Sequence, residues 1–375
     1  MCWPLTVLAL LLAVGTFAWQ TPGIGLVGSL GGYVPGWLVL LGAAGVVTGG
    51  IAWFVEPSAG VPVATALSAM AVAAGVKVII DQRAALRSVG VETVLRDYFG
   101  PFLRSGARPD DVVTYGPVRG RYPRMAVYRP RPSESPAPVV VHVHGGGWMS
   151  GDEVGDKAFC RYLSDRGFLV FSPTYTLATE ERPTWESAPR EIACALTTAN
   201  ALSVQYDGSA DAVYITGSSA GGNLATLVAI RVAQGERFGL EHGRIPRVAA
   251  VAVNIPAVDP GFAEGTAYAF SGGLARRFAE TYTGGTPESV PDRYAAVDAS
   301  NFLSRQSPPT LLVYGPNDWL VPREATLTFA RRARIMGVDV RAVPVPWTGH
   351  LIGLSGAGGR AIAELTVEWF RRHGE

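Results

Sequence analysis

Cysteine is scarce in this sequence of 375 residues, which contains only Cys2, Cys160 and Cys194. A disulfide framework needs paired cysteines, and a zinc site needs Cys or His ligands at short spacings. Three scattered cysteines satisfy neither pattern. The sequence therefore predicts no disulfide-stapled fold and no metal site.

Net charge is also nearly absent, because 32 Lys and Arg residues stand against 31 Asp and Glu residues, which leaves +1. Only two of the basic residues are lysines, Lys77 and Lys157. Proteins that bind nucleic acid carry a basic surface that neutralises phosphate groups. The charge balance therefore predicts that nucleic acid is not a partner.

Charged residues are missing altogether from positions 1–54, and this stretch contributes much of the positive mean hydropathy of +0.20. Two apolar runs, residues 37–55 and 61–80, are long enough at about 1.5 Å per residue to span a hydrocarbon layer of roughly 30 Å. A third run, residues 3–19, is shorter. We therefore expect a membrane anchor at 1–82 with two or three transmembrane helices.

The basic residues nearest to these runs are Lys77, Arg83, Arg87 and Arg96, which all lie at or after the end of the last run. Lys and Arg next to membrane spans are retained on the cytoplasmic side. We therefore expect the domain that follows the anchor to be cytoplasmic. A cleaved signal peptide is the less favoured interpretation of the first run, because no basic residue precedes it.

After the anchor, residues 83–110 mix charged and apolar side chains, and Gly90 and Pro101 interrupt the pattern. We expect a juxtamembrane helix or part of a cap there. From residue 111 to the end, short apolar runs alternate with helical patterns, which is typical of an α/β fold with a mostly parallel sheet. The stretch 259–300 fits neither period, and we expect an insertion that covers the top of the sheet. The expected strands are 112–115, 124–128, 139–143, 168–172, 212–216, 248–253, 310–314 and 338–343, and the expected helices are 186–205, 222–234, 323–335 and 360–372.

A nucleophile motif follows the expected strand 212–216 directly. Gly217-Ser218-Ser219-Ala220-Gly221 has the spacing G-x-S-x-G and precedes a helical pattern. A sharp turn between strand and helix exposes a serine hydroxyl, and the next N–H group points at a developing oxyanion. The sequence therefore predicts Ser219 as a nucleophile, with the N–H of Ala220 as an oxyanion donor.

A glycine run follows the expected strand 139–143, in His144-Gly145-Gly146-Gly147-Trp148. Glycines at the end of a strand let backbone N–H groups turn toward a substrate without obstruction by side chains. Phosphate binding is a poor alternative, because no G-K-[ST] sequence and no dinucleotide-binding spacing follow. The run is interpreted as the rest of an oxyanion hole.

An acid and a base should follow the nucleophile in the order Asp or Glu, then His. Of the five histidines, His350 alone comes directly after the last expected strand; the others are His142, His144, His242 and His373. Asp318 follows the strand 310–314, and Asp339 is the alternative acid. The predicted triad is therefore Ser219, Asp318 and His350.

These motifs resemble the hormone-sensitive-lipase-like branch of the α/β-hydrolase superfamily, whose esterases and lipases carry an H-G-G-G turn. The resemblance covers about 111–375 and includes Tyr175-Thr-Leu-Ala-Thr-Glu180, which is similar to the family's Y-R-L-A-P-E. It implies an α/β-hydrolase fold after the anchor and oxyanion donors at the N–H groups of Gly146, Gly147 and Ala220. It also implies a cap formed by 83–110 and part of 259–300.

The chain departs from the family pattern at three positions, Val143, Ser218 and Trp319. The family has more often His before the H-G-G-G histidine, Asp or Thr before the nucleophile, and Pro after the acid. Trp148 is also similar to a residue of arylformamidases and prenylcysteine methylesterases. These departures leave the chemistry intact and concern the substrate.

The sequence thus predicts a membrane-anchored serine carboxylester hydrolase that acts through an acyl-enzyme on a lipophilic small-molecule or lipid ester, without metal or organic cofactor. Amide hydrolysis (including formamides), thioester hydrolysis and acyl transfer share the same acyl-enzyme and remain alternatives. A non-catalytic binding protein on the same fold is disfavoured, because all three triad candidates are present.

Overall fold

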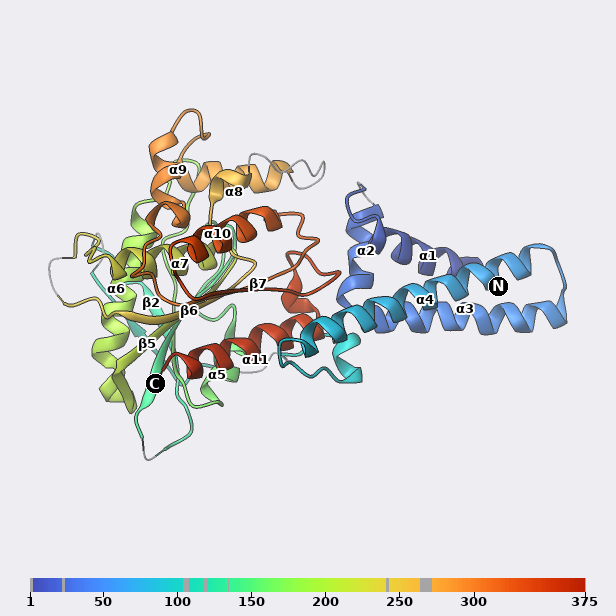
Figure 1. The fold of residues 1–375 in the computed structure, drawn as a ribbon, viewed down its shortest axis with the longest axis horizontal. Coiled ribbons are helices and arrows are strands. Elements are labelled where there is room, and N and C mark those ends of the chain that lie inside the picture. Colours follow the sequence, from blue (N-terminus) through green and yellow to red (C-terminus); the bar gives the residue numbers. More distant parts are fainter. Residues whose placement is uncertain are drawn as a thin grey trace.

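A computed structural model describes residues 3–21, 24–103, 108–117, 120–133, 135–240, 243–263 and 272–374. Figure 1 shows two parts, a globular part with a central sheet and a long helical hairpin that projects from it. The chain begins beside the hairpin, and its last helix ends in the globular part.

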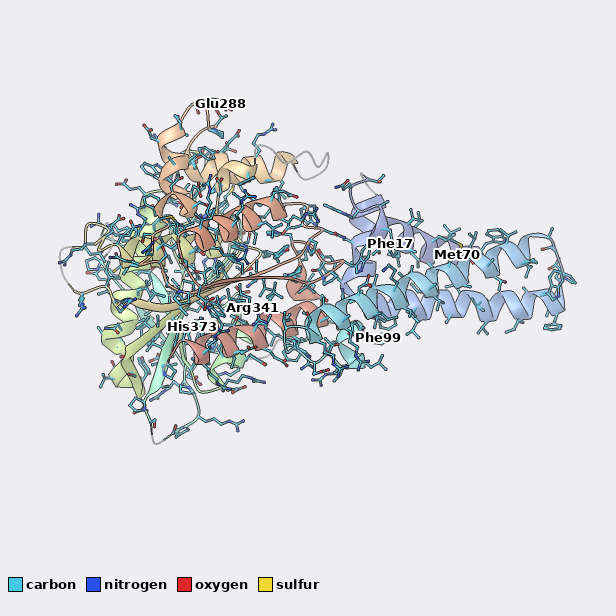
Figure 2. The ribbon with its side chains drawn as sticks, viewed as in Figure 1. Phe17, Met70, Phe99, Glu288, Arg341 and His373 are labelled. Atoms are coloured by element: carbon cyan, nitrogen blue, oxygen red, sulfur yellow. The ribbon has the colours of Figure 1, made fainter. Side chains whose placement is uncertain are left out.

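The hairpin consists of α3 (Pro35–Val55) and α4 (Gly60–Arg87), of 21 and 28 residues with mean hydropathies of 2.1 and 2.0. Among the described residues these two helices are long and apolar enough to cross a membrane. The third expected run forms α1 (Trp3–Phe17), whose 15 residues are too few for a span by the same measure. Met70, on the hairpin in Figure 2, is 63% exposed.

A face of small residues joins the two hairpin helices. A Cβ atom on Gly45 would lie 2.3 Å from the Ser68 hydroxyl oxygen, and one on Gly49 would lie 2.1 Å from that of Thr65. Glycine at these positions therefore lets the two backbones approach closely. The Ser68 hydroxyl that faces Gly45 is also hydrogen-bonded to the hydroxyl of Thr6 in α1, at 2.9 Å.

The globular part contains an eight-stranded sheet in the order β1-β2-β4-β3-β5-β6-β7-β8. The strands β1 and β2 pair antiparallel, and the strands from β3 to β8 run parallel. The bounds are β1 (Asp111–Thr114), β2 (Arg124–Tyr128), β3 (Ala137–Val143), β4 (Leu169–Pro173), β5 (Gly208–Ser218), β6 (Val248–Asn254), β7 (Thr310–Tyr314) and β8 (Val340–Pro344).

Helices cover both faces of the sheet. Successive residues of a strand point to opposite faces, so neighbouring residues enter different cores. On β3, Val139 and Val141 join the core under α6 (Ser187–Leu202), α7 (Ala220–Ala233) and α10 (Arg323–Ile335). Val140 joins the opposite core, under α5 (Lys157–Ser164) and α11 (Gly356–Arg372). The expected fold with a mostly parallel sheet flanked by helices is thus confirmed.

All eight expected strands and all four expected helices are present, with ends that differ by a few residues. Three features were not predicted from the sequence. The first is the helix α5. The second is the set of helices in the described residues of 259–300, which form η3 (Pro260–Ala263), α8 (Gly272–Thr283), α9 (Pro291–Val297) and part of η4 (Ala299–Phe302). The third is the continuation of α4 to Arg87, after which only the short turn η1 (Leu95–Tyr98) follows in the described part of 83–110.

The segment after α4 is held against α11 by a buried ion pair. The Asp97 carboxylate, 1% exposed, accepts a hydrogen bond of 2.7 Å from Nε of Arg360. Leu86 and Tyr98 enter the same core as α11. The helix α4 thus continues across the expected boundary at 82/83, and the described part of 83–110 contacts α11.

Candidate active site

Ser219 lies at the sharp turn between β5 and α7 with a positive φ of 54° and ψ of −118°. Small neighbours make this turn possible. A Cβ atom on Gly217 would lie 2.5 Å from the Gly221 carbonyl oxygen, and one on Gly221 would lie 2.2 Å from that of Val143. A non-glycine residue held at positive φ is strained, and such strain is typical of a nucleophile elbow.

The structure brings the three predicted triad residues together. The Ser219 hydroxyl lies 3.0 Å from Nε2 of His350, and Nδ1 of His350 lies 2.9 Å from Oδ2 of Asp318. These residues come from the ends of β5, β8 and β7, which meet at the carboxyl edge of the sheet. All three are buried, with 8%, 9% and 3% of their surfaces exposed, respectively.

The Asp318 carboxylate is held in place by backbone N–H groups. Its Oδ1 accepts hydrogen bonds of 2.8 Å from the N–H groups of Leu320 and Val321. This fixes the carboxylate so that it can accept the Nδ1 proton of His350, which leaves Nε2 free to accept a proton from Ser219. The alternative acid, Asp339, faces His373 instead, at 3.5 Å.

The glycine turn passes beside the serine. A Cβ atom on Gly145 would lie 3.4 Å from Cβ of Ser219. Gly146 and Gly147 have φ of 108° and 59°, and Cβ atoms there would lie 2.2 Å from the Ser150 carbonyl oxygen and 2.6 Å from the Phe278 ring. Each of the two positions therefore requires glycine, both for its backbone angle and for its space.

His144 supports this turn and is not a second base. Its Nδ1 donates to the Gly145 carbonyl oxygen at 2.7 Å, and its ring stacks on Tyr175 at 4.4 Å between centroids. Burial lowers the pKa of His144, which keeps the ring neutral. The Tyr175 hydroxyl donates to the His144 carbonyl oxygen at 3.2 Å, so the segment 175–180 contributes to the same turn.

His142 makes a different hydrogen bond from those that join Ser219, His350 and Asp318. His142 is hydrogen-bonded to Asp156 at 2.9 Å, and His242 lies outside the described residues. Across the described part of the chain, no group of three or more His, Cys, Asp or Glu side chains could hold a metal ion.

Residues far away in the sequence support the loop that carries His350, and the sequence patterns did not reveal them. The hydroxyl of Tyr33, at the end of α2 (Ile24–Tyr33), accepts a hydrogen bond of 3.3 Å from the N–H of Leu351. Burial raises the pKa of Tyr33 to about 12, so its hydroxyl stays protonated. Gln82 of α4 donates to the carbonyl oxygens of Gly32 and Pro346 at 2.7 and 3.0 Å.

Two further contacts join the hairpin to this loop. The indole N–H of Trp347 donates to Asp81 at 2.7 Å, and its ring packs against Phe17 of α1 at 4.6 Å. Figure 2 shows Phe17 and Phe99 where the helices of the hairpin meet the globular part. The N-terminal helices therefore support the loop that ends in His350.

Two cavities lie next to the triad. The smaller, of about 30 Å³, is lined by Ser219 and Gly147 together with Trp148, Phe262 and Phe278. Trp148 is held there by a stack on Tyr282, with 4.4 Å between ring centroids. Parts of 259–300 thus line the cavity next to Ser219.

The larger cavity, of about 750 Å³, reaches His350 from another side. Pro101 and Leu103 are the described residues of 83–110 that line it. A cap role for the rest of that segment stays a prediction.

Sequence relatives include the protein described as "probable carboxylic ester hydrolase LipM" of Mycobacterium tuberculosis. It is 26% identical over 286 residues, which cover 70% of this chain and 60% of LipM. The matched part thus spans less than two thirds of that relative. Esterase LipC of the same organism is 25% identical over 280 residues, covering 66% of this chain and 68% of LipC.

A solved hyperthermophilic esterase from the archaeon Pyrobaculum calidifontis has a similar fold, with a TM-score of 0.58 and 26% identity over 72% of this chain and 87% of that chain. The predicted α/β-hydrolase fold of the globular part is thereby confirmed. The family model described as BD-FAE matches residues 125–332, which is more than half of the chain. The chain therefore belongs to the BD-FAE family.

Proposed function

We propose that this chain is a membrane-anchored serine carboxylester hydrolase. The observation that carries the proposal is the hydrogen-bonded series from Ser219 through His350 to Asp318, with Ser219 on a strained turn between a strand and a helix. Relatives described as esterases support ester hydrolysis as the reaction.

The proposed reaction begins when the Ser219 hydroxyl attacks the ester carbonyl carbon. Nε2 of His350 takes the hydroxyl proton, and Asp318 stabilises the imidazolium that forms. The same proton then passes to the leaving alcohol oxygen as its bond to the carbonyl carbon breaks. Water next attacks the acyl-enzyme with His350 as the base, which releases the acid and restores the Ser219 hydroxyl.

The negative charge that develops on the carbonyl oxygen needs hydrogen-bond donors, for which we propose the N–H groups of Gly146, Gly147 and Ala220. Ala220 is the first residue of α7, and the first N–H groups of a helix have no acceptor within it. Gly147 lines the same small cavity as Ser219. Donors of this kind stabilise the transition state more than the ground state.

The test is turnover of p-nitrophenyl acetate by the full chain in detergent, with Ser219→Ala as the variant. We expect release of nitrophenol by the wild type and its loss in Ser219→Ala. Ser218→Ala is the matched control, because Ser218 is the neighbouring serine and its hydroxyl donates to Asn254 rather than to His350. Equal turnover by wild type and Ser219→Ala would contradict the proposal.

We further propose that α3 and α4 cross a membrane and that the globular part lies in the cytoplasm. Their length and hydropathy support the first point. The second is supported by Arg83, Arg87 and Arg96, which lie at the end of the hairpin next to the globular part. The turn at residues 56–59 would then lie on the outer side of the membrane.

Labelling of intact cells with a membrane-impermeant thiol reagent tests this topology. Two single-cysteine proteins are compared, Ser58→Cys in the turn of the hairpin and Glu288→Cys at the top of the globular part in Figure 2. Both are made after Cys2, Cys160 and Cys194 have been replaced by alanine. We expect labelling at position 58 in intact cells and at 288 only after permeabilisation. Labelling at position 288 in intact cells, and at position 58 only after permeabilisation, would contradict the proposed orientation.

A further inference from the structure

The two cavities beside the triad differ in size by more than an order of magnitude, about 30 Å³ against about 750 Å³. They also reach different members of the triad. Ser219 lines the smaller cavity, whereas His350 lines the larger one. The chemistry of the triad assigns a different half of the ester to each side.

The leaving alcohol must lie on the side of His350, because its oxygen takes the proton from Nε2 as the tetrahedral intermediate collapses. The acyl group stays bonded to Ser219, and its carbonyl oxygen points toward the glycine turn. The larger cavity is therefore placed for the alcohol half of the ester, and the smaller cavity for the acyl chain.

The smaller cavity limits the acyl chain to a few atoms. A buried water needs roughly 10–15 Å³ by this measure, so about 30 Å³ holds two or three groups of that size. Aromatic rings form part of its wall, since Trp148 stacks on Tyr282 with an angle of 4° between the rings and the Phe278 ring lies beside Gly147. A longer chain would have to displace these rings.

The larger cavity is amphipathic and lies beside the hairpin. Its lining combines the apolar Leu103, Leu351 and Leu354 with the polar His142, Asp156 and Lys157. Leu351 and Leu354 expose 45% and 55% of their surfaces. Exposed leucines at the rim of a cavity favour contact with an apolar phase.

The start of α3 lies close to this cavity. The indole N–H of Trp37 donates to the Phe99 carbonyl oxygen at 2.8 Å, two residues before the cavity-lining Pro101. Tyr33 contacts Leu351, which also lines the cavity. The larger cavity is therefore next to the end of the hairpin from which the membrane-spanning length of α3 begins.

We propose that the substrate is an ester of a short acid, with two to four carbons, and a large amphipathic alcohol that enters the larger cavity from the membrane surface. This inference rests on the proposed function and specifies its substrate class. It assigns the lipophilic part of the expected ester to the alcohol.

Two substrate series test the inference. In the first, p-nitrophenol is constant and the acyl chain grows from two to sixteen carbons. We expect kcat/KM to fall at least about tenfold between butyrate and octanoate, since each methylene that does not fit costs binding. In the second, the acyl group is acetyl and the alcohol is ethanol, hexanol or dodecanol in mixed micelles, and we expect kcat/KM to rise with alcohol length.

Variants of the cavity walls test which cavity binds the acyl half of the ester and which binds the alcohol half. Phe278→Ala should raise turnover of p-nitrophenyl octanoate relative to acetate, because it opens the smaller cavity. Leu354→Trp should raise the KM for dodecyl acetate at least about fivefold, because it fills part of the larger cavity. Leu327→Trp on α10, 41% exposed and outside both cavities, is the matched control.

Product inhibition gives an independent measurement that needs no variant. Free dodecanol should inhibit hydrolysis of p-nitrophenyl acetate competitively, whereas dodecanoate at the same concentration should inhibit at least tenfold more weakly. Preference for long acyl chains, or stronger inhibition by dodecanoate, would overturn the inference while ester hydrolysis by Ser219 stands. Absence of Ser219-dependent turnover on every ester would instead overturn the proposed function itself.

Discussion

The contact between Tyr33 and the His350 loop predicts that the N-terminal helices support catalysis directly. Tyr33 is 2% exposed, and its hydroxyl accepts the N–H of Leu351, the residue after His350. Tyr33→Phe keeps the ring and removes this acceptor. The same hydroxyl also faces the backbone of Gly349 and the side chain of Trp319. The variant therefore removes the polar contacts of one hydroxyl behind His350 and keeps the ring that packs there.

The smallest expected effect follows from the value of one buried hydrogen bond, about 1 kcal/mol net. If this amount is lost from the alignment of His350 in the transition state, kcat falls roughly fivefold. KM should stay the same, because Tyr33 lines neither cavity. The assay is steady-state hydrolysis of p-nitrophenyl acetate by the full chain in detergent, together with the rate of fluorophosphonate labelling of Ser219.

Tyr128→Phe is the matched control for this variant. Tyr128 is also a buried tyrosine, and its hydroxyl has no hydrogen-bond partner in the described part of the chain. The reasoning would be refuted if Tyr33→Phe kept the wild-type kcat, if it changed KM alone, or if Tyr128→Phe lowered kcat equally.

Three further predictions concern the site. Asp318→Asn should lower kcat roughly 10⁴-fold in the same assay, because an amide donor in place of the carboxylate favours the wrong tautomer of His350; a loss under tenfold would argue against its role. Gly147→Ala should lower kcat at least about 100-fold with intact folding, because its Cβ would lie 2.6 Å from the Phe278 ring at a φ of 59° and would displace a proposed oxyanion donor; unchanged kcat would remove Gly147 from that role. Burial, and then the nearby Asp298 carboxylate, raises the pKa of Asp259 to about 6. The unfolded chain ionises this group near pH 4, so the wild type loses stability relative to Asp259→Asn between about pH 4 and 6, by up to about 3 kcal/mol. Thermal unfolding should therefore give equal Tm values for the two proteins at pH 4 and a higher Tm for Asp259→Asn at pH 8. A Tm of Asp259→Asn at pH 8 that is no higher than that of the wild type would contradict the raised pKa of Asp259.

The strands and the triad were predictable because their signals are local. A strand buried on both faces reads as a continuous apolar run, as in 139–143 and 310–314. Ser219 stands in a five-residue motif between a strand and a helix, and Asp318 and His350 come soon after strands. Parallel strands bring these ends to one edge of the sheet, so chain order alone was enough to select the three residues.

The support of the triad was not predictable, because it joins segments that are distant in sequence. Tyr33 and Leu351 are separated by 318 positions, and no periodic pattern links them. Side chains of α8 line the smaller cavity, and residues of the short turn η5 (Ile352–Leu354) line the larger one. A sequence pattern does not specify how these side chains are placed, so it does not give the size of either cavity. The end of α4 was also missed, since charged residues after 80 suggested a break where the helix continues to Arg87.

The central claim is that Ser219 carries the acyl group during turnover. The most direct measurement is mass spectrometry of the full chain, quenched with acid during hydrolysis of p-nitrophenyl acetate and digested to peptides. We predict one acetylated residue, Ser219, at a level that falls when substrate is exhausted, and no acetylated peptide in Ser219→Ala. Turnover with Ser219 unmodified, or an acetyl group that accumulates on another residue, would contradict the account.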